Sequence, residues 1–210
     1  MGTRTRARVG AGLRWGFALV VIAAIAPTGC GTSRDQPRAP ALPHDLVREA
    51  RPIGPGPRFH PPATGPIPGR CEPRLGRRIA AHLEAFAENR VVIVAAGIGT
   101  QPPRRIFAGR IAGARCYGAL ATIDPTGLVL VRPGARLTVG DLFRAWGQPL
   151  SEHHLASFAA PRGSTVSVFV GGVRRHVAPG SVPLTPHAEI VLEVGPYVPP
   201  HASYTYPPGT

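Results

Sequence analysis

Four histidines are the side chains of this chain best suited to hold a metal ion, namely His82, His153, His154 and His176. Imidazole is the commonest metal ligand in proteins and suits zinc and copper. His153 and His154 are adjacent, however, and adjacent side chains of a helix or strand point to different faces, so an exposed turn is the simpler interpretation. We therefore predict no metal site and no cofactor. A metal-binding protein or enzyme built on this chain would draw its ligands from these four residues.

Catalytic motifs with a known mechanism are absent from the sequence. It has no G-x-S-x-G nucleophile elbow, no H-E-x-x-H zinc motif and no phosphate-binding loop. Serine, histidine and aspartate are scattered along the chain, and a triad assembles in space rather than in sequence, so that alternative stays open. The sequence nevertheless predicts that this protein is not an enzyme.

Three cysteines offer two other chemistries. Cys30 ends a Thr-Gly-Cys segment that is similar to the end of a bacterial lipobox, in which the cysteine is acylated and becomes the new N-terminus; Pro27 stands where that motif usually has leucine. Cys71 and Cys116 then remain as a pair. A disulfide between them would close a loop of about 45 residues and stabilise the domain by up to about 4 kcal/mol. Two free thiols are the alternative, and no C-x-x-C pair supports a zinc site.

Residues 1–29 have the pattern of a signal peptide. Arginines precede an uninterrupted apolar run over residues 15–26, which is shorter than the about 20 residues that a transmembrane helix needs. Lipoprotein processing would attach the chain to a membrane through Cys30. Ordinary processing after the small residues 24–26 would instead leave a soluble secreted or periplasmic protein with Pro27 at its start.

Composition divides the remainder into three parts. Residues 30–70 are rich in Pro, Gly and Arg, and such a stretch buries too little apolar surface to offset its ordering entropy. We expect a semi-rigid linker that could reach roughly 120 Å from an anchor. A globular, β-rich domain follows over residues 71–195, and residues 196–210 form a Pro/Tyr-rich tail.

The net charge is strongly positive, with 24 basic and 11 acidic residues, and every basic residue is arginine. This pattern is typical of codon bias in a GC-rich bacterial genome. The arginines are scattered and do not interleave with aromatic residues, which argues against nucleic-acid binding. A basic surface could instead face anionic lipid or a cell-wall polymer.

Two hairpins are predicted by turn residues between apolar runs. Residues 79–87 and 91–96 flank Glu-Asn-Arg, although residues 79–87 also fit a helical period. Residues 165–170 and 173–177 flank a Gly-Gly pair, a strong two-residue hairpin signal. Further strands are expected over 116–123, 128–132 and 189–194.

One helix is predicted over residues 138–146. Thr138 can cap its start, Asp141 lies in its first turn and Gly147 follows its end. Leu142, Phe143 and Trp146 fall on one face, which would pack on a sheet. The fold class expected is α+β, with about seven short, mostly antiparallel strands and one short helix packed on the sheet.

Several segments of the chain, among them Ala96-Gly97-Ile98-Gly99, Trp146-Gly147-Gln148-Pro149-Leu150 and Tyr204-Thr205-Tyr206-Pro207, resemble an uncharacterised family of exported or membrane-tethered bacterial proteins. That family has an alternating His-x-His strand, a His-Thr-His-Asp segment, a Trp-Gly-Gln-Pro-Leu segment and a Tyr-x-Phe-Pro tail. The positions here that carry the resemblance are His82, Ala96-Gly97-Ile98-Gly99, Leu120, Thr122, Asp124, Gly127, Trp146-Gly147-Gln148-Pro149-Leu150, Glu193-Val194-Gly195 and Tyr204-Thr205-Tyr206-Pro207. No established activity comes with the family.

The chain departs from the family where that family has its histidines. Alternating histidines on neighbouring strands would share one face and could hold a metal. Here the matching positions are Ala80, Ala121, Ile123 and Leu130, and only His82 remains. We expect this face to pack as core, with His82 a lone, partly buried histidine.

These observations favour an exported, lipid-anchored envelope protein that carries a non-enzymatic interaction or structural domain. Its expected partners are the membrane, through the N-terminal lipid, and an envelope protein or cell-wall polymer, with no nucleic acid among them. The alternative is an extracytoplasmic metal-binding protein or enzyme.

Overall fold

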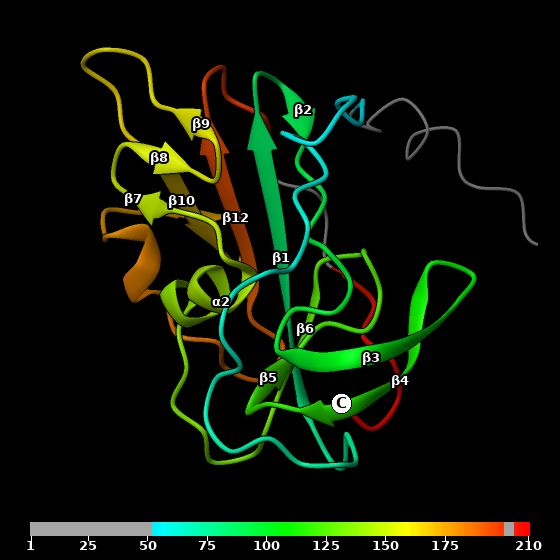
Figure 1. The fold of residues 1–210 in the computed structure, drawn as a ribbon. Coiled ribbons are helices and arrows are strands. Elements are labelled where there is room, and N and C mark those ends of the chain that lie inside the picture. Colours follow the sequence, from blue (N-terminus) through cyan, green and yellow to red (C-terminus); the bar gives the residue numbers. More distant parts are fainter. Residues whose placement is uncertain (1–51, 200–203) are drawn as a thin grey trace, which may run out of the picture. The chain divides into compact units, whose positions relative to one another are not determined.

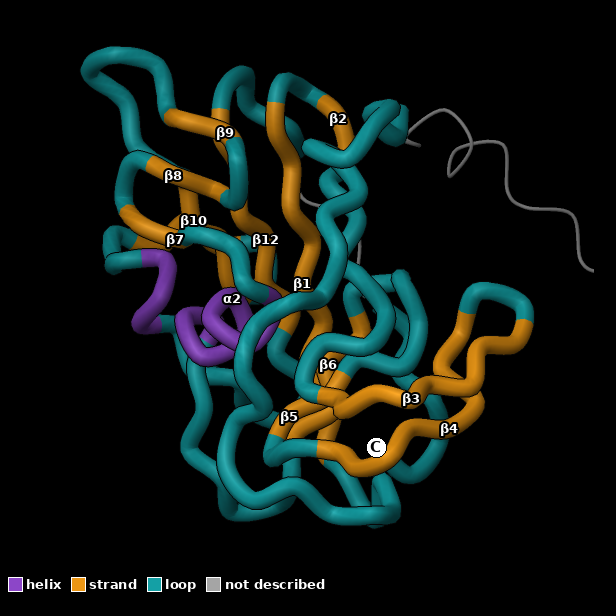
Figure 2. The backbone as a smooth tube through the Cα atoms, in the orientation of Figure 1, coloured by secondary structure: helices purple, strands orange, loops and turns teal. Residues whose placement is uncertain are grey.

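The computed structural model describes residues 52–199 and 204–210. The expected signal peptide, Cys30 and residues 30–51 of the expected linker lie outside the described residues. No helix within the described part of the chain is long and apolar enough to cross a membrane. Strands make up most of the regular structure (Figure 2).

The largest sheet has seven strands, in the order β11-β10-β12-β1-β6-β5 with β2 paired to β1 (Figure 1). Its strands are β1 Ile79–Ala87, β2 Arg90–Val91, β5 Leu120–Ala121, β6 Leu128–Val131, β10 Ser167–Val170, β11 Val173–Arg175 and β12 Glu189–Val194. The neighbours β1 and β12 run parallel, and the other pairs run antiparallel. The predicted strand over residues 79–87 is therefore confirmed, at the centre of the sheet.

The remaining strands form two smaller sheets. The hairpin of β3 Thr100–Phe107 and β4 Arg110–Tyr117 forms a sheet by itself, and the third sheet contains β7 Leu150–Ser151, β8 His154–Leu155 and β9 Phe158–Ala159. The prediction of about seven strands was wrong, because residues 52–199 and 204–210 alone contain twelve strands in three sheets. The sequence did not predict β3, because prolines and arginines interrupt its apolar pattern. It did not predict β7, β8 and β9 either, because each has only two residues and so shows no periodicity.

The predicted helix is confirmed as α2, Val139–Trp146. The Thr138 hydroxyl accepts a bond from the Asp141 amide, and the Asp141 carboxylate accepts one from the Thr138 amide at 2.9 Å, which completes a capping box. Gly147 ends the helix in the left-handed conformation. The buried face of α2 joins β1 and β12 in one hydrophobic core. A short 3-10 helix, Pro179–Ser181, precedes β12.

Both predicted tight turns are confirmed. Glu88 and Asn89, between β1 and β2, have φ of 54° and 60°. Gly171 and Gly172, between β10 and β11, have φ of 57° and 74°. Two consecutive residues with positive φ give the turn a twist that matches that of the flanking strands.

Both faces of β1 are covered, which explains its nearly continuous apolar sequence. Ala81, Leu83 and Ala85 face the core that contains α2. On the opposite face, Ala80 lies with β6 and Tyr204, and Phe86 lies with β10, β12 and Val198. The Pro/Tyr-rich tail thus packs on the second face of the sheet in its described residues, 196–199 and 204–210.

Residues 52–70, expected to belong to the linker, also pack on the domain. Phe59 is only 6% exposed, and its ring centroid lies 4.7 Å from that of Phe158. The Trp146 indole donates a hydrogen bond of 2.9 Å to the carbonyl of Pro61. Within the described residues, the part that packs on the domain therefore already includes residues before Cys71, among them Phe59 and Pro61.

Candidate functional site

His82 lies on the second face of β1, under the C-terminal tail. It is 7% exposed, and its Nε2 lies 2.9 Å from the carbonyl oxygen of Thr126. Because that oxygen can only accept, Nε2 carries a proton. The ring stacks on Tyr204, with centroids 3.8 Å apart and an angle of 13° between the planes. His82 therefore packs the C-terminal tail against the sheet through its contact with Tyr204.

Tyr206 continues this aromatic cluster. Its ring meets that of Tyr204 edge-on at 5.0 Å and stacks with His187 at 4.5 Å. The Tyr206 hydroxyl donates a hydrogen bond of 3.0 Å to the carbonyl of Ala188. Burial, with the nearby Glu189 carboxylate, raises the pKa of Tyr206 to about 12. The neutral phenol is thus the form that holds the tail in place.

A pocket of about 600 Å³ opens beside this cluster. Its apolar lining comes from Leu75, Ile123, Leu128, Leu130 and Tyr204. Ile123 and Leu130 were both expected to pack as core; Leu130 is buried, but Ile123 is only half-buried and lines the pocket. The expected core on this face is therefore a small apolar cluster below an open pocket.

Arginines supply the charge of the pocket. Arg77, Arg78 and Arg110 line it together with one acidic side chain, that of Asp124. Arg110 forms an ion pair of 3.3 Å with Asp124, so the charges of Arg77 and Arg78 are uncompensated by other side chains of the lining. An apolar floor with cations at its wall can bind a small anion that has an apolar body.

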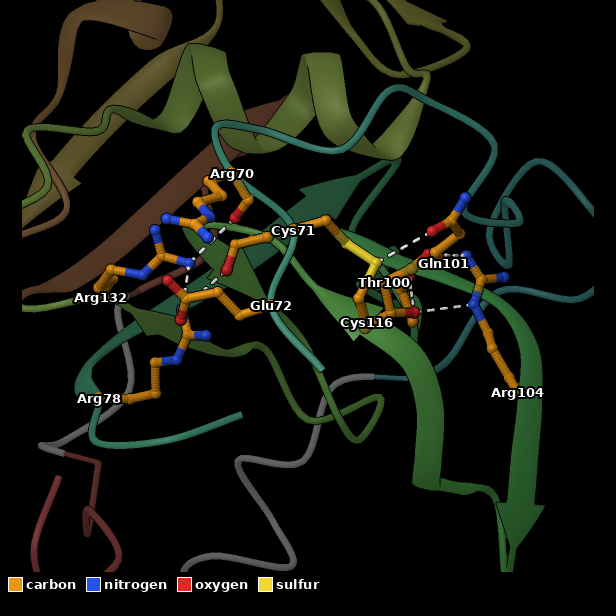
Figure 3. Close-up of a disulfide and its surroundings, with 11 residues drawn as sticks. Arg70, Cys71, Glu72, Arg78, Thr100, Gln101, Arg104, Cys116 and Arg132 are labelled. Atoms are coloured by element: carbon orange, nitrogen blue, oxygen red, sulfur yellow. Dashed lines mark hydrogen bonds and ion pairs between the residues drawn. A yellow bond between two sulfur atoms is a disulfide. The ribbon is translucent and has the colours of Figure 1, made fainter. Parts of the chain in front are cut away.

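Arg78 is fixed rigidly in the wall. It is 5% exposed, and its Nε donates to the carbonyl of Leu75 at 2.7 Å, while Nη1 donates to that of Gly118 at 2.9 Å. Burial lowers the pKa of the Arg78 guanidinium, and repulsion from Arg132 lowers it further. Arg132 itself pairs with Glu72 at 3.2 Å (Figure 3).

The predicted disulfide between Cys71 and Cys116 is present, with the Cα atoms 5.4 Å apart (Figure 3). It joins the chain before β1 to the end of β4, where Glu72 and Tyr117 exchange two backbone hydrogen bonds. The same link holds the base of the β3–β4 hairpin beside the arginine wall. It therefore contributes to both the pocket and the position of the hairpin.

The structure does not bring the four candidate histidines together. His153 and His154 are exposed in the β7–β8 hairpin, where His153 Nδ1 lies 3.3 Å from the carbonyl of Ser164. His176 is exposed after β11, and His82 lies under the tail. Over residues 52–199 and 204–210, no group of three His, Cys, Asp or Glu side chains is placed to hold a metal ion.

The β3–β4 hairpin is the feature that sequence patterns missed. Its tip turns at Ala108 and Gly109, with φ of 47° and 76°, and carries exposed Ile106 and Phe107. Behind the tip, a shallow hollow of about 500 Å³ is lined by Arg104, Arg105 and Arg115 among others. A short Ala-Gly turn between arginine-rich segments was the available signal.

In comparisons with known proteins, no family model, curated protein or solved structure matches this chain. The family resemblance stated above therefore stays a prediction.

Proposed function

We propose that this chain is an exported envelope protein, anchored by a lipid at Cys30, whose domain is a non-enzymatic binding module. The ligand of the module is a small amphipathic anion held in the pocket beside His82. The observation that carries the binding role is the combination of an apolar floor with Arg77 and Arg78 at the wall.

Export is supported by the pattern of residues 1–29, and the Cys71–Cys116 disulfide is compatible with it because such bonds persist in oxidising compartments. With residues 52–70 packed on the domain, the linker shortens to residues 30–51. In extended form it would span about 70 Å at about 3.1 Å per residue.

The pocket supports binding rather than catalysis. Its lining contains apolar side chains, backbone, arginines and the Asp124 carboxylate, which is already paired with Arg110. Arginine stays protonated at neutral pH and serves to bind anions rather than to transfer protons. A carboxylate or phosphate head would lie at the arginine wall, and its apolar body would contact Ile123 and Leu130.

The test is a fluorescence titration with anilinonaphthalene sulfonate, which has an apolar ring system and one anionic group. Arg77→Gln should weaken binding about threefold to fivefold, as expected at most for an ion pair with an exposed arginine. Ile123→Glu should weaken it about tenfold, because the new carboxylate faces both the anion and the apolar floor.

Arg74→Gln is the matched control. Arg74 is exposed, lies in the same segment as Arg77 and is not part of the pocket lining. The control removes the same charge and should leave the affinity unchanged. Equal affinity of all three variants and the parent chain, with unchanged thermal stability, would rule out the pocket as the binding site.

A further inference from the structure

We propose that the β3–β4 hairpin docks on an anionic lipid membrane, with Ile106 and Phe107 inserted among the headgroups and the arginines behind them bound to lipid phosphates. This contact is distinct from the proposed pocket ligand and from the lipid at Cys30, although Ala108 and Arg110 of the hairpin also line the pocket. It depends on the architecture of the hairpin alone.

The tip of the hairpin is apolar and unusually exposed. Phe107 is 77% exposed and Ile106 65%, the two highest values among the large hydrophobic side chains of the described residues. Scattered exposed hydrophobic residues are ordinary on protein surfaces. These two are consecutive and lie at the end of the two-stranded sheet formed by β3 and β4, a hairpin that extends from the side of the seven-stranded sheet (Figure 1).

The shaft of the hairpin is cationic. Residues 100–117 contain four arginines, Arg104, Arg105, Arg110 and Arg115, and no acidic residue. Arg110 pairs with Asp124, whereas no ion pair involves the other three within the described part of the chain. Arg104 is held in position by hydrogen bonds to Thr100, of 2.8 Å to the hydroxyl and 2.6 Å to the carbonyl.

The distance between the apolar tip and the arginines of the hairpin matches the distance between the acyl boundary and the phosphates of a bilayer. Arg104 lies three positions before Phe107 on β3, which corresponds to about 10 Å along a strand. Interfacial apolar groups typically enter the headgroup boundary by about 5–10 Å. With Phe107 at that depth, Arg104, Arg105 and Arg115 lie level with the phosphates, and the hollow that they line can receive a headgroup.

Charge complementarity selects this partner. Phosphate groups of anionic lipids attract arginine, and the apolar tip contributes only where hydrocarbon is available. A soluble polyanion such as a nucleic acid would engage the arginines but would leave Ile106 and Phe107 in water. The two halves of the hairpin together therefore specify a membrane rather than a dissolved polymer.

The experiment measures backbone hydrogen exchange of the full chain reconstituted in vesicles, followed by mass spectrometry. One set of vesicles contains phosphatidylcholine alone, and the other adds phosphatidylglycerol. Any N-terminal anchor is present in both sets, so a difference in peptides covering residues 104–111 reports on the hairpin. We expect slower exchange there with phosphatidylglycerol, and a loss of this effect at high salt.

Two double variants separate the contributions. Ile106→Ser with Phe107→Ser should abolish the protection. Arg105→Gln with Arg115→Gln should weaken the protection, lowering the equilibrium constant for hairpin docking by about fivefold for each arginine. The control is Arg174→Gln with Arg175→Gln, an equal charge change on exposed β11, and it should behave as the parent chain.

Three results would overturn the proposal. They are equal exchange in both kinds of vesicle, unchanged protection in the Ser double variant, and equal protection by soluble polyphosphate without vesicles. None of these outcomes depends on whether the pocket binds anilinonaphthalene sulfonate, so the two proposals fail separately.

Discussion

Loss of the Cys71–Cys116 disulfide should destabilise the domain by a predictable amount. The two cysteines are 45 residues apart, and cross-linking a loop of that size removes about 13 cal/mol/K of entropy from the unfolded chain in the chain-entropy model. At room temperature this is about 4 kcal/mol. A domain of this kind has a total stability of about 5–15 kcal/mol, so the loss is a large fraction.

The assay is equilibrium denaturation in urea of the parent chain, with and without reductant, and of the Cys71→Ser/Cys116→Ser double variant. The reduced parent and the double variant should share one midpoint, well below that of the oxidised parent. The m-value should rise slightly because the unfolded chain becomes less constrained. Thiol titration should show two additional thiols after reduction.

The structure also indicates that the native fold does not depend on the disulfide alone. Glu72 and Tyr117, next to the two cysteines, exchange backbone hydrogen bonds of 2.9 Å and 2.7 Å, which do not need the disulfide. The native fold should therefore persist in the double variant at low denaturant. A midpoint that does not move, or equal thiol counts before and after reduction, would refute the reasoning.

Three further predictions concern the ends of the chain. Phe59→Ala should lower the free energy of unfolding by about 3–5 kcal/mol because Phe59 lies in the core. Phe107→Ala at the exposed hairpin tip should change it by less than about 0.5 kcal/mol. An unchanged stability of Phe59→Ala would show that residues 52–70 do not contribute to the folded domain. The raised pKa of Tyr206 means that the unfolded chain loses this proton at lower pH than the folded one, so its contribution to stability is complete below pH 10 and is lost as the pH rises toward about 12. Alkaline unfolding curves should therefore differ between the parent and Tyr206→Phe in that window, and coincident curves would contradict it. Cys30→Ala should move the protein from the membrane fraction to the soluble fraction of cells, while Cys71→Ser should leave that distribution unchanged; membrane association of Cys30→Ala equal to that of the parent would exclude the lipid anchor.

Elements defined by local signals could be predicted from the sequence. Thr138 with Asp141 marks the start of α2, and Gly147 marks its end, because caps act over three or four residues. The Gly171-Gly172 turn is equally local. The cysteine pair followed from counting rather than from geometry.

Elements defined by tertiary packing could not be predicted. Phe59 lies in a stretch of Pro, Gly and Arg whose composition indicates a linker, yet the stretch is ordered by one aromatic side chain and by hydrogen bonds with Trp146. Ile123 and Leu130 were expected as core because they are apolar. Burial of Ile123 depends instead on where the tail with Tyr204 and Tyr206 lies, and the pattern of a single strand carries no information about a distant tail.

The arginines show that the role of a charged residue could not be predicted from the sequence either. Their abundance has a simple explanation in codon bias, and composition alone cannot separate the guanidinium groups that act from those that are incidental. The fold makes the distinction, because Arg78 is buried in a pocket wall and Arg105 and Arg115 line a hollow behind an apolar tip, whereas Arg174 and Arg175 lie on an exposed edge strand. Replacing the arginines of each set by glutamine removes positive charge at a different place in the fold. A comparison of the variants therefore separates the effect of position from the effect of net charge. If all sets had equal effects on anion and membrane binding, net charge rather than the fold would determine what this protein binds.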